Sequence, residues 1–191
     1  MVTSIRQLDP QKIYTYTDYL TWQLKDRVEL IKGYITKMAP APGRRHQEIS
    51  GQLFLQIGNQ LRHKPCRLYS APFDVKLPTP EGDTVVQPDL CIICDLDKLT
   101  EQGCHGAPDL IIEILSPGNS RRERKEKFEL YQESGVQEYW LVEPYEESIL
   151  VYVLNEEGQY IGSKPFVPGE VIHPITLPGL EVEVSSLFQD F

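Results

Sequence analysis

The chain has 191 residues, a formal net charge of −9 and 40% hydrophobic residues. That is enough apolar material for a buried core, and one domain over residues 1–191 is the default expectation for this length. No apolar run approaches the roughly 20 residues of a membrane span, and the N-terminal segment lacks the apolar core of a signal peptide. We therefore expect a cytoplasmic protein with no membrane partner. The acidic balance argues against broad, non-specific nucleic-acid binding, which needs a basic surface.

The first third of the chain predicts a short helix, a hairpin and a long helix. Residues 16–25 are typical of a short helix, with Thr17 as a candidate N-cap. Residues 27–38 predict two short strands about a turn at Lys32-Gly33. Between residues 45 and 63 apolar residues recur every four positions, which predicts an amphipathic helix of about five turns.

The middle of the chain predicts strands and one charged helix. Residues 67–77 are strand-like, with an interruption at Pro72, and apolar strands are expected at 84–94, 109–115 and 138–142. The near-continuous apolar character of 84–94 and 109–115 predicts burial on both faces. A helix is expected from Arg121 to Ser134, capped by Asn119 or Ser120 and ended by Gly135. The strands at either end of this strand–helix–strand unit should be parallel if they share a sheet.

The last third predicts short strands separated by Gly and Pro, at residues 148–154, 160–166, 171–174 and 180–184. Together these elements predict a mixed α/β (α+β) domain, with a partly parallel, partly antiparallel β-sheet flanked by helices and additional antiparallel strands.

Two acids lie inside apolar strands. Asp89 falls within the 84–94 strand and Glu113 within the 109–115 strand. Burying a carboxylate there costs on the order of several kcal/mol unless a cation or hydrogen-bond donors satisfy it. One interpretation is that both acids face one divalent cation such as Mg²⁺, which binds carboxylates and waters. The other is that each acid lies at a strand end or pairs with a neighbouring Arg or Lys.

The charged helix also allows two interpretations. It could present a solvated face with i,i+4 pairs such as Glu123–Lys127. Alternatively Lys127, which shares a side with Tyr131, reaches back towards the Glu113 strand, orients or activates a water, and stabilises charge on a phosphate. The outer arginines, Arg121 and Arg124, could then contact the phosphate backbone.

Three further acidic or histidine positions have less decisive contexts. His46, in the first turn of the long helix, is either structural or flanks a metal or substrate together with Glu48. Asp109 is either a second metal ligand or a strand-start residue that caps a loop.

The four cysteines give a superficial zinc pattern, with Cys91 and Cys94 followed by Cys104-His105. Residues three apart in a strand point to opposite faces, so the first pair cannot easily chelate one ion. We expect the cysteines to be buried free thiols without a disulfide, as is usual in a reducing compartment.

The ordered motifs resemble the PD-(D/E)xK nuclease superfamily, and within it the Uma-two family of restriction endonucleases. The resemblance rests on VELIKG, His46 opening a helix, QPDL, PDLIIEILSP, Lys127 with Tyr131, and GVQEYWLVEP, in a core of about residues 28–144. It implies a restriction-endonuclease-like fold and a metal-dependent phosphodiesterase that cuts DNA, with Asp89 and Glu113 binding Mg²⁺ or Mn²⁺.

The resemblance also implies roles for further residues. The lysine of the superfamily motif should stand two positions after Glu113, where this chain has Leu115; Lys127 is the matching position on the helix, and Lys125 is a second candidate. Candidate substrate-binding residues are His46, Arg121, Arg124 and Tyr131, with Gln87 and Glu123 nearby. By analogy the protein could be a homodimer. Two alternatives remain open: a catalytically silent nuclease-fold module that binds nucleic acid or a protein, and a scaffold of buried ion pairs.

Overall fold

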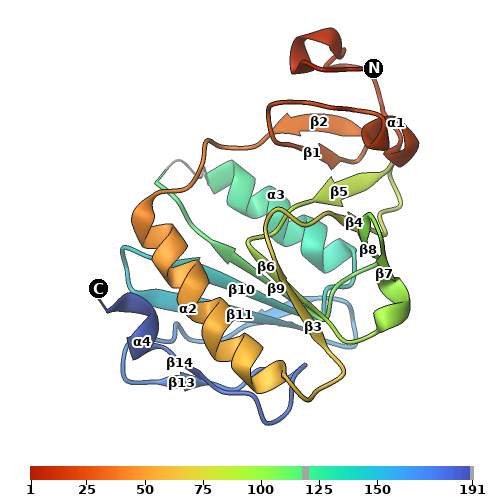
Figure 1. Ribbon diagram of the computed structural model, residues 1–191. Coiled ribbons are helices and arrows are strands. Elements are labelled where there is room, and N and C mark those ends of the chain that lie inside the picture. Colours follow the sequence, from red (N-terminus) through yellow and green to blue (C-terminus); the bar gives the residue numbers. More distant parts are fainter. Residues whose placement is uncertain (118–120, 190–191) are drawn as a thin grey trace.

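Two six-stranded sheets make up most of the fold in the computed structural model, which describes residues 1–117 and 121–189, without the side chains of residues 122 and 123 (Figure 1). The first sheet has the order β2 (Tyr34–Lys37), β1 (Val28–Ile31), β5 (Thr84–Val86), β4 (Val75–Leu77), β8 (Gly103–His105) and β7 (Leu99–Thr100). The second has the order β12 (Tyr160–Gly162), β11 (Ser148–Leu154), β10 (Glu138–Glu143), β9 (Leu110–Ile114), β6 (Leu90–Ile93) and β3 (Arg67–Ser70).

The remaining elements are helices and one small ribbon. The α-helices are α1 (Tyr16–Leu20), α2 (Arg44–Leu61), α3 (Arg121–Glu133) and α4 (Ser185–Phe188); the 3₁₀ turns are Ile5–Gln7 and Leu96–Lys98. β13 (Val171–Ile172) pairs with β14 (Val182–Glu183). The predicted mixed α+β class is confirmed. None of the helices in the described part of the chain is long and apolar enough to cross a membrane.

The second sheet is mixed, and helices cover both of its faces. β9 and β10 are parallel and are connected through α3, as predicted, whereas β6–β9 and β10–β11 are antiparallel. Side chains alternate between the two faces of a strand. Ile112 and Trp140 therefore pack with α2 and the C-terminal elements on one face. Ile111 and Tyr139 pack with α3 and the first sheet on the other face.

The segment predicted as one strand over residues 84–94 is two strands in different sheets. β5 belongs to the first sheet and β6 to the second. Pro88 has no N–H for a sheet ladder, so the pairing stops at residues 87–89 and the chain crosses between the sheets there. Asp89 consequently lies between two strands and not within one. The segment at 67–77 divides in the same way, into β3 and β4.

Other predicted boundaries also change. The predicted hairpin and the helices α2 and α3 are present, although the candidate caps Asn119 and Ser120 of α3 lie outside the described residues. α1 is capped by Thr15 and not Thr17, because Thr15 and Asp18 form a reciprocal capping box. Of the C-terminal strands, β11 has the predicted bounds, whereas β12, β13 and β14 are shorter than predicted.

The prediction of four free thiols is wrong for one pair. Cys66 and Cys94 form a disulfide, whereas Cys91 and Cys104 are free and buried. The reason lies in the antiparallel register of β3 and β6, which places Arg67 opposite Ile93. The residue before β3 and the residue after β6 therefore come face to face. Cys91 and Cys94 do point to opposite sides, as expected.

Candidate active site

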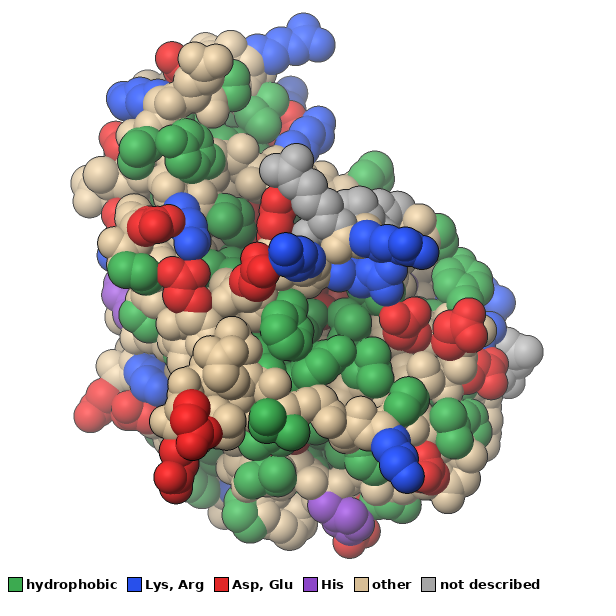
Figure 2. All heavy atoms as spheres, turned by 180° about the vertical axis from the view of Figure 1, so that it is seen from behind, with side chains coloured by type: hydrophobic (Ala, Val, Ile, Leu, Met, Phe, Trp, Pro, Cys, Tyr) green, Lys and Arg blue, Asp and Glu red, His purple; other side chains and the backbone are tan. Residues whose placement is uncertain are grey.

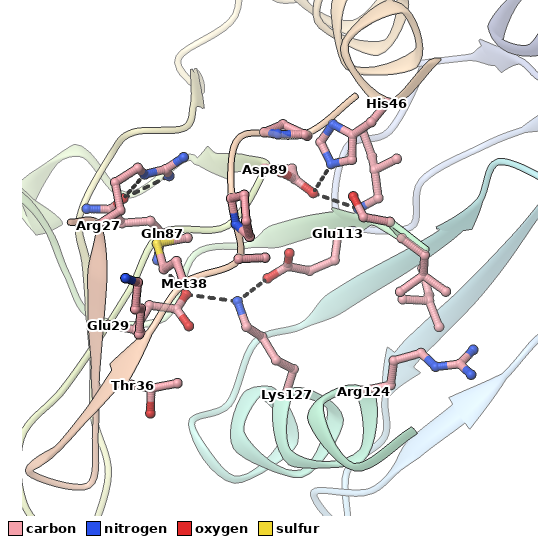
Figure 3. A pocket seen from close by; sticks show the side chains of 18 of the residues that line it. Arg27, Glu29, Thr36, Met38, His46, Gln87, Asp89, Glu113, Arg124 and Lys127 are labelled. Atoms are coloured by element: carbon pink, nitrogen blue, oxygen red, sulfur yellow. Dashed lines mark hydrogen bonds and ion pairs between the residues drawn. The ribbon is translucent and has the colours of Figure 1, made fainter. Parts of the chain in front are cut away.

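Asp89 lies where the chain enters β6, and its carboxylate reaches the end of β9. Its Oδ2 accepts a hydrogen bond from the backbone N–H of Ile114 at 2.8 Å and lies 3.1 Å from Nε2 of His46. The histidine comes from the first turn of α2 and is buried, with its Nδ1 lacking a partner among the described residues. Two contacts from different elements thus hold one oxygen of Asp89 in place (Figure 3).

Glu113 lies on β9, on the face of the sheet that α3 covers. Its Oε1 accepts hydrogen bonds from Nζ of Lys127 at 2.9 Å and from the hydroxyl of Tyr131 at 2.5 Å. Both donors come from α3, four residues apart, and such residues lie on the same face of a helix. Leu115 lines the same pocket two residues after Glu113, so the motif's lysine position is apolar here, and the ammonium group that contacts Glu113 comes from the helix.

Lys127 is shared between two carboxylates. Its Nζ lies 2.9 Å from Oε1 of Glu113 and 2.9 Å from Oε1 of Glu29 on β1. The three side chains are 15%, 16% and 6% exposed respectively. Glu29 also accepts a hydrogen bond from the backbone N–H of Gln87. The first sheet is thereby joined to α3 and to the second sheet through one ammonium group.

The site holds more negative than positive buried charge. Burial raises the pKa of Glu113 to about 7, and the nearby Asp89 and Glu29 add to this rise although Lys127 opposes it. Burial alone would lower the pKa of Lys127, but Glu113 and Glu29 raise it well above its ordinary value. The lysine is therefore a fixed positive charge, and the carboxylates around it would gain from a further cation.

Most of the predicted site residues converge on one pocket. Its walls include the two acids and the lysine together with His46, Gln87 and Arg124 (Figure 3). Arg124 pairs with Glu143 at 3.2 Å. The pocket has a volume of about 110 Å³, enough for an ion with several waters.

Three other candidates, Tyr131, Arg121 and Lys125, lie outside this pocket. Tyr131 is fully buried behind Glu113 and contacts the acid. Arg121 lines a neighbouring hollow with Phe128. Basic side chains do lie beside hydrophobic ones on one face of the molecule (Figure 2). Lys125 is exposed and pairs with Glu129. The side chain of another candidate, Glu123, lies outside the part of the chain that the structure describes.

The two remaining acids have local partners. Asp109 accepts a hydrogen bond from the backbone N–H of Cys94 at 2.7 Å. This contact agrees with the interpretation of Asp109 as a residue that caps a loop. Glu48 pairs with Arg44 one helical turn before it.

The donor set of the pocket fits a hard divalent cation. Oδ1 of Asp89 and Oε2 of Glu113 accept no hydrogen bond from the described residues, so each acid has an oxygen available to a ligand. Within the described ranges, no three His, Cys, Asp or Glu side chains are grouped to hold an ion. The protein would thus provide two carboxylates. Mg²⁺ is commonly bound in this way, with waters or phosphate completing its coordination.

Sequence reasoning missed Glu29 and Arg27. Glu29 stands in the apolar run VELI, the same signal that singled out Asp89 and Glu113, and it is only 5% exposed. Arg27 lines the pocket and donates two hydrogen bonds to Oε1 of Gln87. Its role depends on a contact 60 residues away in the chain, which no local pattern signals.

The fold is restriction-endonuclease-like: a mixed sheet carries one acid on β9 and a second at the entry to the neighbouring β6, beside a lysine from the helix that covers the sheet. The family model of Uma2, described as "Putative restriction endonuclease", matches residues 16–185, and the chain belongs to this family. The resemblance drawn from the sequence is therefore confirmed.

Proteins similar to this chain include one from Synechocystis and one of known structure from Anabaena variabilis. An uncharacterised protein of Synechocystis sp., slr1290, is 26% identical over 147 residues, which covers 75% of this chain and 76% of the relative. A crystal structure described as "a putative nuclease belonging to DUF820" from Anabaena variabilis has a TM-score of 0.69 and 24% identity, covering 86% of this chain and 90% of that one. At this level of identity the structural match shows a shared fold.

Proposed function

We propose that this protein is a divalent-metal-dependent endonuclease that hydrolyses DNA phosphodiester bonds. The observation that carries the proposal is the meeting of Asp89, Glu113 and Lys127, from three separate elements, at one pocket with surplus negative charge. Membership of a family described as restriction endonucleases and the fold shared with a described nuclease support it. Asp89 and Glu113 are the proposed metal ligands, for Mg²⁺ or Mn²⁺.

A cation bound by these carboxylates would polarise the phosphate and make a bound water more acidic. Lys127 acts beside it as a donor and a positive charge, because its two carboxylate partners keep it protonated. An ammonium group has three N–H donors, and Glu29 and Glu113 take two of them. The third can orient the attacking water or stabilise charge on a phosphate oxygen.

The contacts suggest positioning roles for two residues that the sequence suggested for substrate binding. His46 is buried and holds Oδ2 of Asp89, and Tyr131 is buried and holds Oε1 of Glu113. Each leaves the other oxygen of its acid available to a metal. Arg124 remains a proposed phosphate contact, because Glu143 engages only one of its guanidinium nitrogens and the others can donate to a phosphate. Arg121, exposed at the start of α3, is the second proposed phosphate contact.

Calorimetric titration of Mn²⁺ or Mg²⁺ into the protein tests the metal site. We expect binding by the wild type, none by Asp89→Ala, and unchanged binding by the control Glu156→Ala, which alters an exposed acid. Absent binding in the wild type, or equal binding in the Asp89 variant, would refute the metal site.

A plasmid-nicking assay tests catalysis. Removing one hydrogen-bond donor that stabilises transition-state charge typically lowers the rate by about 10²- to 10³-fold, and we expect this loss for Lys127→Ala. Unaltered nicking by that variant would remove Lys127 from the mechanism. A wild type that binds metal but never cuts would favour the alternative function, a silent module that binds nucleic acid or a protein.

A further inference from the structure

A shallow groove leaves the candidate active site and follows α2. Its first part is lined by Asp89, His46 and Arg27, which also line the active-site pocket. The exposed side chains of Phe54 and Leu55 line this first part and also the second, which continues to the end of the helix. α2 contacts β3 along this side of the sheet, where Figure 1 shows the two elements beside each other. The groove is thus continuous with the site.

The charge of the groove is opposite to that of the whole protein. Arg27 lies at one end, and Arg62 and Arg67 line the other. Among the described residues, Asp89 is the one acid on its walls, although the chain has 28 Asp and Glu residues. At a rise of 1.5 Å per residue, Phe54 lies about 12 Å along the helix axis from His46 and about 12 Å from Arg62. A polyanion leaving the site would therefore meet an aromatic ring and then cations.

The aromatic ring indicates the form of the polyanion. Phe54 is 40% exposed and Leu55 is 55% exposed, so they present apolar surface between the arginines. In a duplex the faces of the bases are covered by their neighbours, whereas an unpaired base can stack on an exposed aromatic side chain. Aromatic side chains interleaved with cations in a groove are the arrangement that binds single strands.

From this combination we infer that the groove along α2 binds a single-stranded segment of nucleic acid next to the scissile phosphate, with a base stacked on Phe54. The inference rests on the proposed nuclease function and narrows it to substrates with an unpaired strand, such as flaps, overhangs or single strands. Arg62 and Arg67 contact the backbone of that strand.

Fluorescence anisotropy in EDTA tests the inference on the full chain, with labelled oligothymidylate and a matched duplex as probes. The wild type should bind the single strand more tightly than the duplex. Phe54→Ala should weaken single-strand binding by about 5- to 150-fold, the effect of losing one stacked base, and Phe54→Trp should retain it. Ile161→Ala is the control, because Ile161 is 60% exposed on β12 at the other edge of the sheet.

Gly51 allows a test that does not depend on weakening the fold. It lines the groove, and an added Cβ there would meet no atom within 4 Å. Gly51→Ala should raise the melting temperature and keep binding, because alanine is favoured over glycine inside a helix. Gly51→Glu should also fold, but it should no longer bind the single strand, because the added side chain places a negative charge in the groove. Arg62→Gln should reduce the salt dependence of single-strand binding by a slope of about 0.7.

The inference would be overturned if Phe54→Ala and Ile161→Ala changed the affinity for the single strand equally. It would also be overturned if Gly51→Glu bound the single strand as tightly as the wild type does, or if the wild type bound the duplex more tightly than the single strand. It would also fail if sedimentation showed a dimer that Phe54→Ala dissociates without altering single-strand binding, since a second copy would then occupy the groove. Because strand binding is measured without metal, the groove and the metal-dependent nuclease are tested separately. Strand binding without cleavage would refute the nuclease alone, and duplex nicking unaffected by Phe54→Ala would refute the groove alone.

Discussion

Replacing Lys127 by methionine should destabilise the protein by about 3–5 kcal/mol at pH 8. The ammonium group lies 2.9 Å from a carboxylate oxygen of both Glu29 and Glu113, and all three side chains are largely buried. Removing one partner from a buried ion pair typically costs about this much, because the other charge stays buried without compensation. Here one ammonium group pairs with two carboxylates, so we expect a loss in the upper part of the 3–5 kcal/mol range, which is about that for one buried pair.

The loss should shrink at low pH. The pKa of Glu113 is already raised from an ordinary 4.5 to about 7, and removing Lys127 raises it further. A raised folded-state pKa favours the protonated carboxyl, so this contribution stabilises the fold at low pH and is lost as the pH rises through the folded-state value. The Lys127→Met variant should therefore be closest to the wild type near pH 5 and furthest from it at pH 8.

Urea unfolding at both pH values measures the effect as a shift in midpoint at constant slope. Lys125→Met is the matched control, because Lys125 lies on the same helix but is 74% exposed, and it should change stability by less than about 0.5 kcal/mol. Adding Glu113→Gln to Lys127→Met should restore part of the loss. A loss below about 1 kcal/mol at pH 8, or one independent of pH, would refute the buried arrangement of these charges.

Three further predictions concern the supports of the site and of the sheets. Tyr131→Phe should cost about 1–3 kcal/mol in chemical denaturation, because a buried hydrogen bond to Glu113 is lost; an unchanged midpoint would contradict that contact. The first backbone N–H of α1, together with Lys76, holds the pKa of Asp83 below its ordinary 3.8, so Asp83 stabilises the fold above that value and loses the effect as the pH falls through its folded-state pKa. Asp83→Asn should therefore lower the melting temperature at pH 7, with the two melting curves converging below pH 3.8. Reducing the Cys66–Cys94 disulfide should lower the free energy of unfolding by about 3–4 kcal/mol for its separation of 28 residues. A thiol assay in denaturant should find two free thiols before reduction and four after it, and four at the outset would show that the disulfide is absent.

The sequence by itself determined the elements whose signals are local. The four-residue apolar period of α2, the turn between β1 and β2, and the apolar strands β9 and β10 around a charged helix all depend on neighbouring residues. The same holds for the acids Asp89 and Glu113, because an acid in an apolar run stands out without knowledge of its partners. Lys127 could be chosen over Lys125 because it shares a helix face with Tyr131, and the structure does place it on Glu113.

Tertiary structure alone decided everything that depends on register and on contacts between distant segments. The disulfide follows from the alignment of β3 with β6, and one residue of slip would turn the cysteines away from each other. Glu29 became part of the site because the first sheet packs over α3, 98 residues away in the chain. The position of Asp89 between two sheets arises only when β5 and β6 pair in different sheets, and the groove that joins it to Phe54 arises only when α2 lies against β3. Such contacts are set by packing, for which no short stretch of sequence has a signal.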